Sequence, residues 1–246
     1  MLAGIKEILI ITTPQDSDDF KNLLGDGKSI GISLEYAVQP KPEGLAQAFI
    51  IAENFIGDNS VALILGDNIF YGSGLGRRLS EIPNDVGATI FGVRVKDPER
   101  YGVVEISENG LIRSIEEKPK HPKSNIAVPG LYFFDRTVSK RAKMVTKSER
   151  GELEITSVID SYLKDNSLVL RELEENTAWM DCGTVESMND ASNFIRKIEQ
   201  SSGNKIGCIE EIAWQYKWID DDALINISNY YGKNEYGMYI RNLLSN

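Results

Sequence analysis

Two aspartates stand directly after apolar runs that are typical of buried strands. Asp67 follows Val61–Leu65, and Asp181 follows Ala178–Met180. Ligands of open α/β sheets bind beyond the carboxyl ends of strands, and Mg²⁺ takes one or two carboxylates together with phosphate oxygens. Both aspartates are therefore candidate magnesium ligands, on the condition that the two strand ends lie side by side. Alternatively, each tract only turns the chain, with Thr184 capping the next helix.

A Glu-Lys pair ends the pattern of a β-hairpin. Asn109-Gly110 lies between two strand patterns, Tyr101–Ser107 and Leu111–Glu116, and Asn-Gly at such a position predicts a hairpin turn. Just after the second strand, Lys118 could bind a phosphate as a point charge, and Glu117 could accept hydrogen bonds from sugar hydroxyls. The alternative is a solvated surface pair without a ligand.

Several loop residues could complete a binding site. The amide of Gln39 can read a base edge in two directions, and Gly44 would let a base or ribose approach the backbone closely. Tyr101-Gly102 could set a small residue and a backbone N–H against a sugar, and Glu152 could bind a sugar hydroxyl. The structural alternatives are a proline-stiffened loop for the first pair, a strand start for the second, and an acidic helix start for Glu152.

The sequence argues against several other functions. Its net charge of −10 disfavours general nucleic-acid binding, which needs clustered Lys and Arg. The single histidine, His121, weakens Ser-His-Asp hydrolase readings, and the chain has neither a G-x-G-x-x-G nor a P-loop motif. Cys182 and Cys208 form no zinc-binding pattern and fit a reducing cytoplasm. No apolar run approaches the ~20 residues that a membrane helix needs.

The coarse pattern predicts an α/β fold. Short apolar runs alternate with helical patterns, which indicates a Rossmann-like, mixed and mostly parallel sheet with helices on both faces. The expected strands besides the hairpin are Glu7–Thr12, Leu34–Gln39, Val61–Leu65, Ala88–Val95, Ala127–Phe134, Leu168–Glu172 and Ala178–Met180, and the expected helices are Asp16–Leu24, Leu45–Ile56, Leu75–Ile82, Thr137–Val145, Ile155–Lys164 and Glu186–Ile198.

The C-terminal stretch differs from the rest of the chain. Residues 209–244 form short helical patterns rich in Trp and Tyr, which predicts a helical extension rather than another βα unit. We therefore expect a core at residues 1–200 and a C-terminal helical extension at residues 201–246 that packs on it.

Each motif is modest alone, but their order resembles that of the glucose-1-phosphate thymidylyltransferases, a family of sugar nucleotidyltransferases. The resemblance runs nearly end to end through the following tracts: Gln39-Pro40, Gly44-Leu45-Ala46-Gln47-Ala48, Leu65-Gly66-Asp67-Asn68, Asp97-Pro98-Glu99-Arg100-Tyr101-Gly102-Val103, Glu116-Glu117-Lys118-Pro119, Gly151-Glu152-Leu153-Glu154-Ile155-Thr156 and Trp179-Met180-Asp181-Cys182-Gly183-Thr184. Two departures are small, since Cys182 and Pro129 stand where the family often has Thr.

The resemblance implies a role for each candidate residue. Asp67 and Asp181 would hold Mg²⁺, with Asp67 also facing the nucleotide. Gln39 and Gly44 would contact the thymine base. Lys118 would bind the phosphate of glucose 1-phosphate, and the sugar side would be lined by Tyr101, Gly102, Glu117, Val128, Glu152 and Trp179. The implied partners are dTTP, glucose 1-phosphate and dTDP-glucose, in a homo-oligomer that is often a tetramer in the family, serving dTDP-rhamnose and surface polysaccharide synthesis.

One departure from the family is large. The family's first strand leads into a loop, G-G-x-G-T-R-L, that wraps the triphosphate, and the 246 residues contain no such tract. We therefore expect a missing N-terminal strand–loop–helix unit of about 30 residues and weak or no turnover by the chain as written. Two alternatives remain: a non-catalytic regulatory paralogue that binds nucleotide sugars, and a related transferase that uses UTP or CTP.

Overall fold

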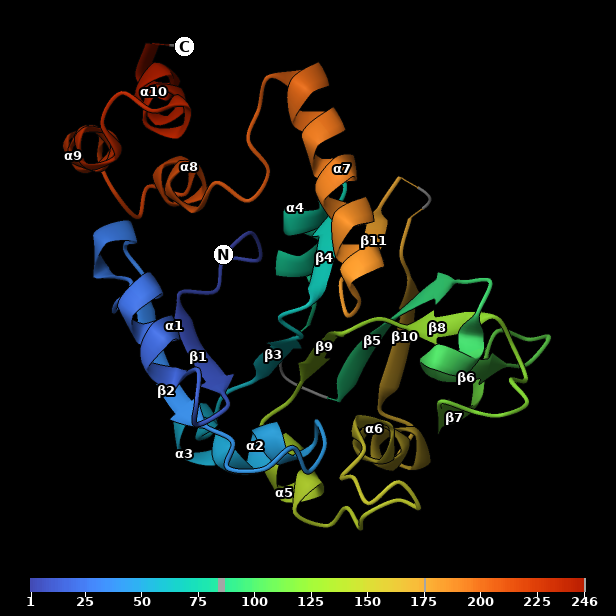
Figure 1. The fold of residues 1–246 in the computed structure, drawn as a ribbon. Helices are drawn as coiled ribbons and strands as arrows, with labels where there is room; N and C mark the ends of the chain where they lie inside the picture. Colours follow the sequence, from blue (N-terminus) through green and yellow to red (C-terminus); the bar gives the residue numbers. More distant parts are fainter. Residues whose placement is uncertain (84–86, 175, 246) are drawn as a thin grey trace. The chain divides into compact units, whose positions relative to one another are not determined.

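The computed structural model describes residues 1–83, 87–174 and 176–245, which group into two units (Figure 1). The sheet unit comprises Val38–Ser73 and Glu81–Thr184, and the terminal unit comprises Met1–Ala37, Gly74–Ser80 and Val185–Asn246. The chain therefore passes more than once between the units. The boundary expected near residue 200 stays a prediction.

A seven-stranded sheet organises the described part of the sheet unit. The strand order is β3 (Val61–Ile64), β9 (Leu131–Phe134), β5 (Ala88–Arg94), β8 (Ile126–Val128), β6 (Gly102–Ile106) and β7 (Ile112–Glu117), and β10 (Leu168–Glu172) pairs with β5. Strand β5 is buried over its first five residues, which explains its uninterrupted apolar sequence. The expected hairpin is confirmed as β6–β7, with Gly110 at φ 78° in its turn.

The expected α/β class is confirmed, but the expectation of a mostly parallel sheet is wrong for the described strand pairs. β10 runs parallel to β5, whereas β9 runs antiparallel to both β3 and β5. β8 is antiparallel to β5 and β6, and β6 is antiparallel to β7. The reason is the insertion of β9 between two strands that share a direction, together with the β6–β7 hairpin.

The strand expected at Ala127–Phe134 is two strands, β8 and β9, with different neighbours. Pro129 lacks the N–H that a ladder needs. At Gly130 a Cβ would lie 2.5 Å from the Leu65 side chain, so only glycine lets these two segments approach. Leu65 N–H in turn donates to Gly130 O at 2.9 Å. The break between β8 and β9 thus fixes the segment that leads from β3 to Asp67.

The helices of the sheet unit pack on one another and on the sheet (Figure 1). They are α2 (Gln47–Ile51), α3 (Glu53–Ile56), α5 (Val138–Ala142) and α6 (Ile155–Lys164). The helix expected at Leu45–Ile56 is therefore interrupted, at Ala52. The Phe134 ring on β9 joins the sheet to two helices, since it lies 5.1 Å from the Phe49 ring and 5.6 Å from the Tyr162 ring. Helices on the other face of the sheet stay a prediction.

A two-stranded ribbon carries both candidate metal ligands. Strand β4 (Asn68–Tyr71) pairs antiparallel with β11 (Ala178–Asp181), and Asp181 stands opposite Asn68 (Figure 1). Strand β4 escaped the sequence analysis because Asn68-Ile69-Phe70-Tyr71 follows a Gly-Asp turn and is too short for a clear alternation. The ribbon nevertheless meets the condition set above, because it brings the two strand ends together.

The terminal unit holds a second ribbon and most of the remaining helices. Its elements are β1 (Glu7–Thr12), α1 (Ser17–Leu24), η1 (Lys28–Ile30), β2 (Ser33–Val38), α4 (Leu75–Ser80), α7 (Val185–Ser202), α8 (Ile209–Gln215), α9 (Asp221–Tyr231), α10 (Glu235–Asn242) and η3 (Leu243–Ser245). Short aromatic-rich helices were expected here and are present as α8–α10. The buried Glu210 carboxylate accepts hydrogen bonds from the Tyr231 hydroxyl at 2.9 Å and the Tyr236 hydroxyl at 2.6 Å, which ties the three helices together. Among the described residues, no helix is both long and apolar enough to cross a bilayer.

Candidate active site

A cavity of about 190 Å³ opens within the sheet unit, and most of the candidate residues line it. Its walls are Leu45, Leu65, Asp67, Asn68, Arg100, Tyr101, Gly102, Glu117, Lys118, Val128, Gly130, Tyr132, Ile155, Thr156, Ile159, Trp179 and Asp181. Eight of the eleven residues singled out from the sequence thus share one cavity. The other three, Gln39, Gly44 and Glu152, are not part of its lining.

Asp67 and Asp181 approach each other beside Gly183. Cys182 N–H donates to Asp67 O at 2.7 Å, which anchors the turn after β11 to the turn before β4. A Cβ built on Gly183 would lie 3.1 Å from Asp181 Oδ1 and 3.7 Å from Asp67 Oδ2. The two carboxylates therefore border the same small space, and Gly183 leaves that space open.

The donor set at this point suits a hard cation. Two carboxylates on a fixed ribbon, with room for waters and phosphate oxygens, match what Mg²⁺ takes from proteins. Among the residues that the structure describes, no cluster of three or more His, Cys, Asp or Glu side chains could hold a metal. A cation here would therefore depend on substrate oxygens for the rest of its coordination.

Asn68 is a positioning residue, a role that its place in the sequence did not suggest. Its Oδ1 accepts from Trp179 Nε1 at 2.6 Å and from Gly130 N–H at 3.0 Å, and its Nδ2 donates to Asp67 Oδ1 at 2.8 Å. One amide therefore joins both strands of the ribbon to the break between β8 and β9. It also orients the Asp67 carboxylate and the Trp179 ring toward the cavity.

Two aromatic rings and a guanidinium line the cavity together with Asp181. The Tyr101 and Trp179 rings meet edge-on with centroids 5.1 Å apart. Arg100 ends a 3-10 turn, η2 (Pro98–Arg100), and its guanidinium lies 5.3 Å from the centre of the Tyr101 ring. Burial raises the pKa of the Tyr101 hydroxyl, Arg100 opposes this shift and the nearby Asp181 carboxylate adds to it. Tyr101 is thus a neutral hydrogen-bonding group at neutral pH.

Lys118 occupies an unusual backbone position at the mouth of the hairpin. Its φ of 43° lies in the left-handed region that non-glycine residues avoid. Such strain gathers at functional sites, where the surrounding structure imposes it, and here Lys118 N–H donates to Tyr101 O at 3.0 Å. Among the described residues, no carboxylate lies within 4.0 Å of the Lys118 ammonium. Lys118 thus lines the cavity with no ion-pair partner among the residues that the structure describes.

Glu117 lies half-buried beside a second carboxylate. Burial raises the pKa of Glu117, and the negative charge of Glu154 raises it further, while Lys118, Arg150 and a hydrogen bond with Thr156 oppose the rise. Glu154 is itself buried and accepts from Ser148 Oγ at 2.7 Å. Neither Glu154 nor Thr156 was a candidate from the sequence, because their proximity to Glu117 depends on α6 packing against β7.

The raised pKa of Glu117 leads to a stability prediction. Because the folded state holds this proton more tightly than the unfolded state, the group stabilises the fold below its ordinary pKa of 4.5, and that contribution is lost as the pH rises through the folded value. Glu117→Gln stays neutral at every pH. We expect its unfolding temperature, relative to the wild type, to be higher at pH 7 than at pH 4.

A carboxylate on the same hairpin provides a control of opposite sign. A hydrogen bond from Ser114 lowers the pKa of Glu105, and Lys123 and Arg113 add to the shift. Its stabilising effect is present above the ordinary pKa and lost as the pH falls. Glu105→Gln should therefore be less stable than the wild type at pH 7, with a smaller difference at pH 4. Parallel shifts in thermal melts of the two variants would contradict the assignment.

Gln39 and Gly44 belong to a loop held by the segment before α6. Gln39 Nε2 donates to Gln47 Oε1 at 2.7 Å and to Gly44 O at 3.3 Å. Leu153 N–H donates to Glu43 O at 2.7 Å, and Ala46 N–H donates to Leu153 O at 3.0 Å. Two backbone hydrogen bonds thus join the loop that contains Gly44 to the segment before α6. A role of Gln39 and Gly44 in reading the base stays a prediction.

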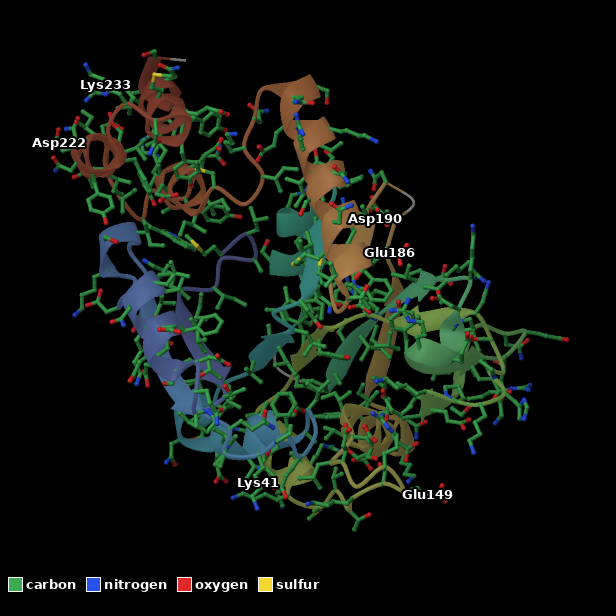
Figure 2. All side chains as sticks on the ribbon, viewed as in Figure 1. Lys41, Glu149, Glu186, Asp190, Asp222 and Lys233 are labelled. Atoms are coloured by element: carbon green, nitrogen blue, oxygen red, sulfur yellow. The ribbon has the colours of Figure 1, made fainter. Side chains whose placement is uncertain are left out.

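Surface charges flank this pair of segments. Lys41 comes from the loop that follows β2, and Glu149 comes from the loop that precedes α6. Both side chains are exposed, and Figure 2 labels both. The two loops are also joined by an ion pair between their side chains, because the Lys147 ammonium lies 2.6 Å from the Glu43 carboxylate.

Gly44 cannot be replaced without disturbing that backbone pairing. Its φ is 105°, and a Cβ would lie 2.4 Å from Leu153 O. We expect Gly44→Ala to destabilise the protein by ~2–4 kcal/mol, from backbone strain plus steric overlap. Gly151→Ala is the matched control, because Gly151 has a φ of 79° with nothing within 4 Å of its Cβ position. It should lose only ~1–2 kcal/mol. Equal losses in urea unfolding would contradict the proposed overlap.

Glu152 lies outside the cavity and forms part of an ionic group around Arg150. The Arg150 guanidinium is 3.3 Å from Glu152, 3.4 Å from Glu154 and 3.9 Å from Glu117. Contact of Glu152 with a sugar hydroxyl stays a prediction, and in this structure its nearest charged partner is Arg150. Arg100 and Thr156 line the cavity although the sequence analysis gave neither a role. The adjacency of Arg100 to Tyr101 was the one available signal.

Comparison with known proteins identifies relatives of this chain. The family model described as nucleotidyl transferase matches residues 1–198. A glucose-1-phosphate thymidylyltransferase from Neisseria meningitidis is 50% identical over 245 residues, covering 99% of this chain and 85% of that protein. One from Mycolicibacterium smegmatis is 51% identical over 244 residues, with the same two coverages.

Solved structures show the same fold. A crystal structure of a glucose-1-phosphate thymidylyltransferase from Bacillus anthracis, in complex with sucrose, superposes with a TM-score of 0.72 at 37% identity. The superposition covers 84% of this chain and 80% of that one. A UDP-glucose pyrophosphorylase bound to UDP-glucose superposes with a TM-score of 0.67 over 80% of this chain and 83% of that one, and at 24% identity it shows the fold alone.

Proposed function

The chain belongs to the glucose-1-phosphate thymidylyltransferase family of nucleotidyl transferases, and on that premise we propose that it joins dTTP and glucose 1-phosphate to give dTDP-glucose and pyrophosphate. One observation carries the proposal. A single cavity presents the neighbouring carboxylates Asp67 and Asp181, the cation Lys118 and the half-buried Glu117. Condensing two phosphate-bearing substrates requires positioning and charge neutralisation of this kind.

The nucleophile of the proposed reaction is the sugar phosphate itself. With a second pKa near ~6, a phosphate monoester is largely dianionic at pH 7. Its oxygen forms a bond to the α-phosphorus of dTTP while the bond from that phosphorus to the bridging oxygen breaks, and pyrophosphate leaves with the electron pair. No protein base has to remove a proton.

The residues of the site would bind different parts of the two substrates. Lys118 binds the phosphate of glucose 1-phosphate and offsets its repulsion from the triphosphate. Glu117, Tyr101 and Trp179 would orient the sugar, next to the small Gly102 and Val128. Gln39 and Gly44 would contact the base, and Glu152 would bind a sugar hydroxyl.

Mg²⁺ is the cofactor that we propose for the carboxylate pair. Asp67 and Asp181 would hold it, and when bound it would supply positive charge to the phosphate oxygens. The cation fits because both carboxylates border one space and each is held by a hydrogen bond, Asp67 by the Asn68 amide and Asp181 by Gly183 N–H. We extend the proposal to a homo-oligomer in the cytoplasm, whose product serves dTDP-rhamnose synthesis. The two free cysteines fit a reducing compartment.

The test combines binding with turnover. Calorimetry with dTDP-glucose, UDP-glucose and CDP-glucose, each with Mg²⁺, measures whether the cavity takes a nucleotide sugar and which base it prefers. Pyrophosphate release from dTTP and glucose 1-phosphate measures catalysis by the same preparation. We expect dTDP-glucose to bind most tightly. Preference for another base would change the substrate, binding without turnover would favour a regulatory paralogue, and no binding of any of the three would overturn the proposal.

A further inference from the structure

We propose that Arg100 is a positioning residue that pairs with Asp181 until a cation binds and thereby sets the affinity of the carboxylate pair for that cation. The inference rests on the proposed function, in which Asp67 and Asp181 hold a divalent cation. It assigns a role to a residue that had none among the candidates from the sequence. Its basis is the way each oxygen of Asp181 is already engaged.

Asp181 is held from several directions. Its Oδ1 accepts from Gly183 N–H at 3.0 Å, and its Oδ2 lies 3.7 Å from Arg100 Nη2. The Tyr101 hydroxyl is close enough to interact with the same carboxylate. Asp67, in contrast, receives an uncharged donor, Asn68 Nδ2. The guanidinium therefore neutralises one carboxylate of the pair and reduces the repulsion between the two.

Contacts with Asp97 and the Tyr101 ring would keep Arg100 in the cavity lining if its guanidinium moved away from Asp181. Its Nη1 donates to Asp97 Oδ2 at 2.9 Å, which is much shorter than the contact with Asp181. The guanidinium also lies against the Tyr101 ring at 5.3 Å. Asp97 is thus its stronger partner. A divalent cation at Asp181 would repel the guanidinium, and the tether to Asp97 lets it give way by a small movement.

The consequence is a competition that metal-binding measurements can detect. A guanidinium a few ångströms from a divalent cation disfavours the cation even in high dielectric, by an amount that corresponds to about threefold to tenfold in affinity. Removing the charge of Arg100 should therefore tighten cation binding in the absence of substrate. This sign is opposite to that expected if Arg100 only held Asp181 in shape, because a purely structural loss would weaken binding.

The experiment titrates Mn²⁺ into the substrate-free protein and follows the free ion by electron paramagnetic resonance. We expect Arg100→Gln to bind Mn²⁺ about threefold to tenfold more tightly than the wild type, and Arg100→Lys, which keeps the charge, to stay near the wild type. Arg94→Gln is the matched control, because it removes an equal charge from an exposed pair with Glu172 in the same unit. Its affinity should not change.

Two outcomes separate this inference from the proposed function. Asp67→Asn should weaken Mn²⁺ binding if the carboxylate pair is the cation site. If the wild type binds more tightly than Asp67→Asn while Arg100→Gln equals the wild type or binds more weakly, the role of Arg100 is wrong and the cation site stands. If the wild type and Asp67→Asn bind equally, the cation site itself is wrong, and the proposal for Arg100 fails with it. Circular dichroism of each variant verifies folding.

Discussion

Lys118→Ala is expected to lower kcat/KM for glucose 1-phosphate by ~10²–10³, the usual effect of removing a charge-stabilising contact from an active site. Lys118 lines the cavity, and among the described residues no carboxylate is paired with it, so its charge is available to a phosphate. Its loss also removes one of the two positive charges, those of Lys118 and Arg150, that lower the pKa of Glu117. Binding of glucose 1-phosphate, measured by calorimetry, should weaken together with turnover.

Two companion variants make this result specific. Lys120→Ala removes an equal charge two residues away, from an exposed side chain outside the cavity lining, and should leave kcat/KM unchanged. Lys118→Gly should relieve the strain of the 43° φ while losing the ammonium, so it should be more stable than Lys118→Ala and equally impaired. If Lys118→Ala loses less than threefold in kcat/KM, Lys118 is not the phosphate ligand.

Local patterns predicted several elements of the fold closely. Glu7–Thr12, Ile155–Lys164 and Leu168–Glu172 are expected and observed with the same bounds, because in each of them hydrophobic periodicity and flanking turn residues agree. The Asn109-Gly110 turn was equally clear. These are segments in which the information lies within one element.

Strand pairing could not be predicted in the same way. The entry of β9 between β3 and β5 depends on Pro129-Gly130 and on the close approach of Leu65, contacts that join segments more than 60 positions apart. Strand β4 exists because β11 pairs with it. Tertiary contacts decide these features, and the sequence pattern of one segment does not contain them.

In the candidate site, too, some residues could be predicted from local sequence and others depend on tertiary contacts. Carboxylates at strand ends and a lysine after a hairpin could be predicted, since the ends of strands are where ligands bind. The link between Asn68 and Trp179 spans 111 positions, and the placement of Thr156 against Gly102 depends on α6 lying over β6–β7. Such partners became visible only in the folded chain. They are residues that hold the predicted ones in place.

Asp67→Asn is the second variant expected to have a large effect. The substitution keeps the size of the side chain and removes one of the two charges that border the space beside Gly183. We expect pyrophosphate release to fall by at least ~10², because a neutral amide oxygen binds Mg²⁺ more weakly than a carboxylate does. Chelation with EDTA should lower the wild-type rate to a similar level and have little further effect on the variant.

Asp67→Asn should not lower the unfolding temperature, although it lowers the rate. This difference distinguishes a loss of catalysis from a loss of folded protein. Asp67 and Asp181 repel each other when no cation lies between them, and the repulsion is only partly offset by Arg100. Asp67→Asn should therefore unfold at the same or a higher temperature than the wild type without Mg²⁺, and Mg²⁺ should stabilise it less.

The control variant is Asp58→Asn, at an exposed position outside the cavity lining. It should keep both the wild-type rate and the wild-type response to Mg²⁺. An Asp67→Asn variant that retains wild-type turnover and the full response to Mg²⁺ would show that the cation binds elsewhere, because in the proposed site Asp67 is one of only two protein ligands.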